Sequence, residues 1–169
     1  KNDYSPAFGN KDYTKIYFTS SRKGSSNDKI DERNGEFFTD IYSSKLGTRE
    51  KWSTPKPEKD PINTDNHEGT LCLNQNGTEM FFTSCKAEEK KKLGCKICIS
   101  EYVLETKGKG KWGKVNTLKI AGLKDTITIG HPTISSDGEF IIFSAEIPWL
   151  QEKEGEYSKG KDLWRIKKW

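Results

Sequence analysis

The stretch Asn76-Gly77-Thr78-Glu79-Met80-Phe81-Phe82-Thr83-Ser84 occurs three times in this chain in recognisably similar form. Earlier along the chain, Lys15–Ser20 reads KIYFTS, and later Glu139–Ala145 reads EFIIFSA. The spacing is even, with 64 positions from Phe18 to Phe82 and 61 from Phe82 to Phe143. A fixed period of this length indicates a repeat architecture, which has to be recognised before any single element is assigned.

Each copy continues in the same order, which favours four short strands per copy. A second strand-like segment follows at Ile41, Ile97 and Leu163, and Lys-Trp pairs close two copies at Trp52 and Trp112. In the second copy we expect strands over 70–74, 79–84, 96–104 and 111–118. Asn76-Gly77, and Asp137-Gly138 in the third copy, predict two-residue hairpin turns of type I′, in which both central residues have positive φ. No run of ten residues shows a helical period.

A unit of about 60 residues with four antiparallel strands matches one blade of a β-propeller. The fold class predicted is therefore all-β: a partial β-propeller forming a single domain over residues 1–169. Its three blades span about residues 1–57, 62–120 and 129–169, and the last is incomplete. Repeated apolar residues would fill the space between neighbouring blades.

Three blades cannot close a ring, since propellers have about four to eight. We therefore expect this chain to be part of a larger protein, with two blade faces left uncovered. A partner chain, a missing segment or a second copy would cover them. Self-association of two copies would complete a six-bladed ring, of which this chain is half.

Composition limits the function classes. Apolar residues make up 31% of the chain, charged residues 32% and aromatic residues 11%, and the net charge is +4. The aromatic content excludes a wholly disordered chain, and no apolar stretch is long enough to cross a membrane. Acidic residues alternate with the basic runs, so no nucleic-acid partner is expected.

The second copy resembles a known propeller repeat. The residues Ile62-Asn63-Thr64, His67-Glu68-Gly69-Thr70 and the stretch from Asn76 to Ser84 are similar to the PD40 repeat, the WD40-like repeat of TolB-type propellers. Pro132, Asp137-Gly138 and Phe143 extend the resemblance to the third copy, and Trp52-Ser53-Thr54-Pro55 is similar to the family's outer-strand W-x-x-P. The sequence departs from the family at Leu71 and Asn74, where Pro and Ser are usual.

The Asn-Thr and His-Glu-Gly form is most similar to propellers of PorE-like, OmpA-family lipoproteins of the type IX secretion system. That resemblance implies a periplasmic scaffold, associated with the outer membrane through parts of the protein outside this chain, whose partners are proteins of a cell-envelope secretion complex. It implies no catalysis, no cofactor and no direct membrane insertion by this segment. The alternative is a propeller that senses carbohydrate or peptidoglycan.

Four cysteines allow several arrangements. Cys85 ends one predicted strand and Cys95 begins the next, which places them as cross-strand neighbours and favours a disulfide between them; Cys85–Cys98 is the alternative register. Residues i and i+3 of a strand point to opposite faces, which disfavours a zinc site built on Cys95-x-x-Cys98. Fully reduced thiols stay open, and Cys72 would pack as a small apolar residue. A disulfide would fit an oxidising compartment.

The two histidines, His67 and His131, each lie just before a predicted innermost strand. Together with Glu68 they are candidates for a partner-binding site or channel mouth. The resemblance favours a structural role for Glu68, as an acceptor of backbone N–H groups. A histidine–carboxylate metal or catalytic site is the less favoured interpretation.

Enzymatic propellers need features that this chain lacks. Its arginines are few and scattered, no Asp-box is complete, and no phosphate loop, HExxH or G-x-S-x-G motif occurs. We therefore expect a non-catalytic binding module that uses the face with the long connections. Trp149 and Tyr157, in the last of these connections, are candidate partner anchors because interface energy concentrates in such rings.

Overall fold

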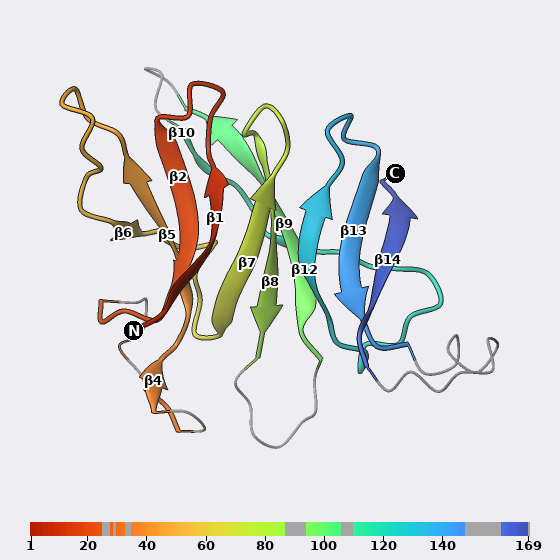
Figure 1. The fold of residues 1–169 in the computed structure, drawn as a ribbon. Helices are drawn as coiled ribbons and strands as arrows, with labels where there is room; N and C mark the ends of the chain where they lie inside the picture. The colour runs from red at the N-terminus through yellow and green to blue at the C-terminus, as the bar shows by residue number, and fades with distance from the viewer. Residues whose placement is uncertain are drawn as a thin grey trace.

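The computed structural model describes residues 1–24, 28, 30–32, 35–86, 94–105, 110–147 and 160–168. Strands, turns and loops account for all of these residues, and no helix occurs among them. The protein is therefore all-β, as the sequence predicts. The strands form three larger antiparallel sheets and one small hairpin (Figure 1).

The first sheet has the order β1-β2-β5-β6, with β1 at Asp3–Phe8, β2 at Lys15–Ser20, β5 at Asp40–Lys45 and β6 at Lys56–Pro57. The short strands β3 (Ile30–Asp31) and β4 (Glu36–Phe37) pair with each other between β2 and β5.

The second sheet contains β7 (His67–Leu73), β8 (Glu79–Cys85) and β9 (Lys96–Leu104). Its outer strand is split: β10 (Gly110–Trp112) and β11 (Asn116–Thr117) both pair with β9. A single strand over 111–118 is thus the wrong prediction. Gly113 separates the two pieces, and a Cβ there would lie 3.0 Å from the Val103 side chain.

The third sheet has three strands, in the order β12 (Ile129–Ile134), β13 (Phe140–Ala145) and β14 (Asp162–Lys167). The sheets lie side by side in chain order, because β7 contacts β1, β2 and β5, and β12 contacts β7, β8 and β9 (Figure 1). The first strands β1, β7 and β12 are therefore neighbours along the series, and the outer strand β10 also reaches the first sheet, since the Trp112 ring centroid lies 5.9 Å from that of Tyr17.

Two apolar clusters join the three sheets. Alternation along β8 sends Met80 and Phe82 toward the first sheet, where they pack with Tyr17 and Ile41. Phe81, which lies between them in sequence, points the other way into a cluster formed with the third sheet. That cluster includes the buried residues Ile97, Ile99, Ile129, Ile141, Phe143 and Ala145.

The tight turns differ from the predicted type. Gly77 and Gly138 have positive φ, but Asn76 and Asp137 do not. The Gly77 N–H donates to the Asn74 carbonyl, and the Asn74 side-chain oxygen accepts from the N–H groups of Thr78 and Glu79. The Asn74 N–H donates to the Glu79 carbonyl, so residues 75–78 form a four-residue loop with one left-handed residue, rather than the two-residue loop of a type I′ turn.

The outer faces of the first and third sheets differ in the exposure of their apolar side chains. On the first sheet, Phe18 and Tyr42 are buried, and the guanidinium of Arg22 lies 5.1 Å from each ring centroid. On the third sheet, Leu163 of β14 is exposed. The first face is covered because a cation over two stacked rings shields them from water.

Candidate functional site

A β-bulge interrupts the first strand of each of the three larger sheets at the same place. The pairing shifts between Tyr4 and Ala7 in β1, between Gly69 and Cys72 in β7, and between Gly130 and Thr133 in β12. The first of the two unpaired residues in each bulge has positive φ although none is glycine: Ser5 (54°), Thr70 (44°) and His131 (53°). Residues other than glycine adopt this conformation only where the surroundings hold it.

Hydroxyl groups of the preceding sheet hold two of these bulges. The Thr70 N–H donates to Thr19 Oγ1 (3.0 Å), and the His131 N–H donates to Thr83 Oγ1 (2.9 Å). Thr19 and Thr83 occupy the same position of β2 and β8, directly after the buried phenylalanine. The contact between first and second sheets is therefore repeated between second and third.

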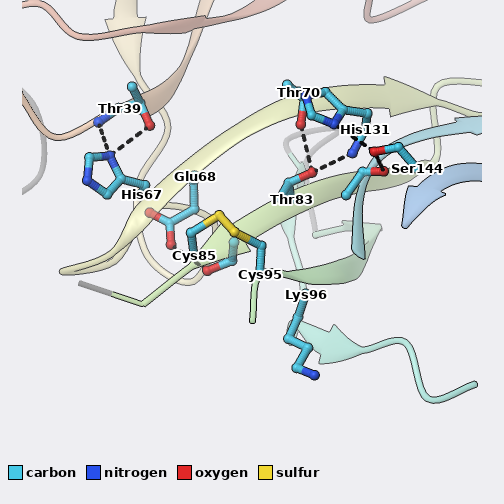
Figure 2. Close-up of a disulfide and its surroundings, with 12 residues drawn as sticks. Thr39, His67, Glu68, Thr70, Thr83, Cys85, Cys95, Lys96, His131 and Ser144 are labelled. Atoms are coloured by element: carbon cyan, nitrogen blue, oxygen red, sulfur yellow. Dashed lines mark hydrogen bonds between the residues drawn. A yellow bond between two sulfur atoms is a disulfide. The ribbon is translucent and has the colours of Figure 1, made fainter. Parts of the chain in front are cut away.

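Side chains link these contacts into one continuous series. Thr70 Oγ1 donates to Thr83 Oγ1 (2.7 Å), and His131 Nδ1 lies 3.0 Å from Ser144 Oγ (Figure 2). We call Thr19, Thr70, Thr83, His131 and Ser144 the hydroxyl ladder. It crosses all three sheets along their inner strands, so the sheets hold a defined relative position.

A cavity of about 540 Å³ opens beside this ladder. Its wall contains five of the seven residues selected from the sequence, namely His67, Glu68, His131, Cys85 and Cys95. Three long connections flank it, because Thr39, the Cys85–Cys95 pair and Lys161 lie at their ends. Trp149 and Tyr157 lie outside the described residues.

His67 is held at both ring nitrogens. Its Nδ1 accepts from the Thr39 N–H (3.3 Å), so the proton belongs on Nε2, which lies 3.0 Å from Asp31 Oδ2. The Phe38 ring packs against the imidazole with centroids 4.3 Å apart. The histidine thus fastens the β3–β4 hairpin to the start of β7, and neither ring nitrogen is left to act as a base.

Glu68 is 1% exposed and serves as an acceptor inside the fold. Its carboxylate accepts from the Thr64 N–H (3.0 Å), the Thr64 hydroxyl (2.7 Å) and the Ser84 hydroxyl (3.0 Å). Burial raises the pKa of this carboxyl above its ordinary value, against the lowering effect of these bonds. Asp3 and Ser20 form the same carboxylate–hydroxyl pair in the first sheet (2.6 Å).

Cys85 and Cys95 form a disulfide at the cavity wall, the first of the pairings that the sequence left open (Figure 2). It joins the end of β8 to the residue before β9. Cys72 and Cys98 are free thiols. Burial raises the pKa of Cys72 to about 12 and that of Cys98 to about 11, so both thiols stay protonated and unreactive at neutral pH.

His131 presents the most accessible polar group of the ladder. Because the Ser144 hydroxyl donates to the Gly130 carbonyl (3.2 Å), the imidazole Nδ1–H donates to Ser144 and leaves Nε2 as an acceptor. No cluster of three or more histidine, cysteine or acidic side chains that could hold a metal occurs in the described part of the chain.

Sequence reasoning missed the ladder hydroxyls and the partners of His67. A signal existed for the first group, because Thr19, Thr83 and Ser144 follow the same phenylalanine in all three copies. No signal existed for Asp31 and Thr39, because the sequence of the long connection in which they lie is not repeated in the other two connections.

Comparison with known proteins adds no family assignment: no family model matches the sequence, and neither does any curated protein. A search for membrane-crossing helices among the described residues finds none that is long and apolar enough.

Proposed function

We propose that this chain is a three-bladed portion of a β-propeller, similar in its repeats to the PD40 family, and that it serves as a non-catalytic scaffold for protein partners. The compartment that this assignment implies is the periplasm. The partners it implies are components of an outer-membrane-associated secretion complex of the PorE-like, type IX kind.

The hydroxyl ladder is the observation that carries the radial arrangement. A propeller needs each blade to contact the next in the same way, through innermost strands, with outer strands diverging. The repeated bulge and its hydroxyl acceptor supply such a contact twice, at Thr19 with Thr70 and at Thr83 with His131.

The chemistry of the cavity favours binding over catalysis. Two of the three titratable candidates in its wall, His67 and Glu68, are committed to hydrogen bonds that hold the fold, and His131 alone of the three keeps a ring nitrogen as an acceptor. The rim, in contrast, is formed where the long connections leave the sheets, and such loops are where repeat proteins concentrate their binding surfaces.

Site-specific photocrosslinking tests this function. A photoreactive residue replaces Lys161, at the cavity rim, in the protein expressed in a bacterium with type IX secretion; Lys51, an exposed residue at the outer edge of the first sheet, is the matched control. We expect adducts with secretion proteins from position 161 and none from position 51.

Two results would contradict the scaffold role. Adducts at position 161 that contain glycan strands and no protein would instead support a function in carbohydrate or peptidoglycan sensing. Equal adducts from both positions would show that the cavity rim has no special role in partner binding.

A further inference from the structure

One position on the outer face of the third sheet, Leu163, is apolar and exposed, and it shares that face with the exposed residues Arg165 and Lys167 of the same strand. Leu163 pairs with Ser144 in register, as Ile41 pairs with Thr19 and Ile97 with Thr83. Ile41 and Ile97 are 0% exposed because the following sheet covers them, whereas Leu163 is 79% exposed. A side chain at this position is otherwise always covered by another sheet.

The ladder also ends on this face. Ser144 follows Phe143 as Thr19 follows Phe18, but its Oγ forms hydrogen bonds with His131 and Gly130 of its own sheet. Within the described residues, no backbone N–H of a further bulge reaches it. One acceptor position on Ser144 Oγ is therefore open. The equivalent position on Thr19 and Thr83 accepts a backbone N–H from the bulge of the next sheet.

The complementary half of this contact exists at the other end of the molecule. Ser5 occupies the bulge position of Thr70 and His131 with the same left-handed φ. Among the described residues, no side-chain hydroxyl accepts from the Ser5 N–H.

The side chains of the two ends also fit each other. The residue before the bulge is glycine in the second and third sheets. A Cβ at Gly69 would lie 2.7 Å from the Thr19 methyl, and a Cβ at Gly130 would lie 3.1 Å from the Thr83 methyl. The first sheet has Tyr4 at this position, so a threonine opposite it would clash. Ser144 lacks the methyl group, which removes one of the two close contacts. It keeps the hydroxyl, which in Thr19 and Thr83 lies 3.1 Å from the Cβ position, so a partner residue with a Cβ fits here after a shift of a few tenths of an ångström.

We propose that a second copy of this chain docks head to tail, with its first sheet on the outer face of the third sheet. The Ser5 N–H of one copy then donates to Ser144 Oγ of the other, and Leu163 is buried beside the Arg22 side chain that covers Phe18. This inference rests on the proposed radial arrangement. Two such contacts related by a two-fold axis close a ring of six sheets, which stops further growth.

Solution mass provides the first test. The chain should sediment at about twice its mass of 19.3 kDa and dissociate on dilution. Leu163→Asp should shift it to monomer. Leu104→Asp is the matched control, because Leu104 is 75% exposed on β9, away from the proposed contact, and should leave the dimer intact. A monomer at all concentrations, or equal effects of both variants, overturns the proposal.

Engineered disulfides provide the second test and separate the two levels of inference. In the within-chain control, Thr83→Cys with Gly130→Cys should crosslink, since a Cβ at Gly130 would lie 3.7 Å from the Thr83 Cβ, within the range for disulfides. A mixture of Tyr4→Cys and Ser144→Cys proteins should then form a crosslinked dimer, with the unmodified protein as background.

The outcomes of this test have distinct meanings. If the within-chain control crosslinks and the mixture does not, docking of the second copy is wrong while the arrangement of the three sheets stands. If the control also fails, the radial arrangement on which both proposals rest is wrong.

Discussion

The backbone N–H of His131 donates to Thr83 Oγ1 at 2.9 Å, across the boundary between second and third sheets. Thr83 also accepts from the Thr70 hydroxyl, so one side chain serves the bulges of two sheets. The arrangement of the sheets therefore depends on a few hydroxyl groups. The effect of removing each hydroxyl on the free energy of unfolding can be measured.

Replacement of Thr83 by valine keeps the shape of the side chain and removes the hydroxyl. The His131 N–H and the Thr70 hydroxyl then lose their acceptor, which should lower the free energy of unfolding by about 1 to 3 kcal/mol. Denaturant unfolding measures it. Thr133→Val on the exposed side of β12 is the control and should change stability by less than about 0.5 kcal/mol. Equal losses in both variants would contradict a special role for the ladder.

Replacement of Gly69 by alanine should destabilise the protein because the new methyl would meet the Thr19 side chain at 2.7 Å. We expect a loss of about 1 to 3 kcal/mol from overpacking. Thr19→Ser removes the opposing methyl and should recover part of that loss in the double variant, a coupling that a double-mutant cycle detects. Gly160→Ala, where a Cβ meets nothing within 4 Å, should be neutral. Strict additivity of the two substitutions would refute the steric explanation.

Reduction of the Cys85–Cys95 disulfide should lower stability by about 2 to 3 kcal/mol, the chain-entropy value for a short closed loop. Thermal or urea unfolding with and without a phosphine reductant measures the difference. The Cys85→Ser, Cys95→Ser double variant should show the same loss without reductant and no response to it. A reductant effect that persists in this variant would assign the stabilisation to something else.

The pH dependence of stability should carry a contribution from Glu68. Its pKa is raised in the folded protein, chiefly by burial, so the folded state binds the proton more tightly than the unfolded state does. The stabilising contribution is complete below the ordinary value of 4.5 and is lost as the pH rises through the folded-state pKa.

Comparison with Glu68→Gln isolates this effect. The free energy of unfolding of the wild-type protein, relative to the variant, should fall as the pH rises from below 4.5 toward neutrality. Glu101→Gln on the exposed side of β9 serves as control and should show no such trend. A relative stability that increases over this range would show that hydrogen bonding from Thr64 and Ser84 outweighs burial.

Much of the fold could be predicted because its signals are local. Alternating apolar residues and turn residues identified β8 and β9 to within a residue, and placed Cys85 next to Cys95 at one end of their hairpin. The turn type was wrong because the Asn74 side chain, rather than the backbone of Asn76, closes the loop. The split between β10 and β11 likewise depends on contact at Gly113, which no local pattern reports.

The candidate site could be predicted only in part. His67, Glu68 and His131 were selected from their places before or at the start of predicted inner strands, and the structure brings them to one cavity. Their roles differ because of partners far along the chain: Asp31 and Thr39 engage His67, whereas His131 keeps an imidazole nitrogen as an acceptor toward the cavity.

The amino-acid order alone was enough to establish strands, turns and a threefold repeat, since these follow from side-chain alternation and the conformational preferences of neighbouring residues. It could not establish that Ser5, Thr70 and His131, three chemically different residues, share one left-handed bulge. Hydroxyl groups 51 and 48 positions away receive the N–H groups of Thr70 and His131, and such contacts form only when separate sheets pack together.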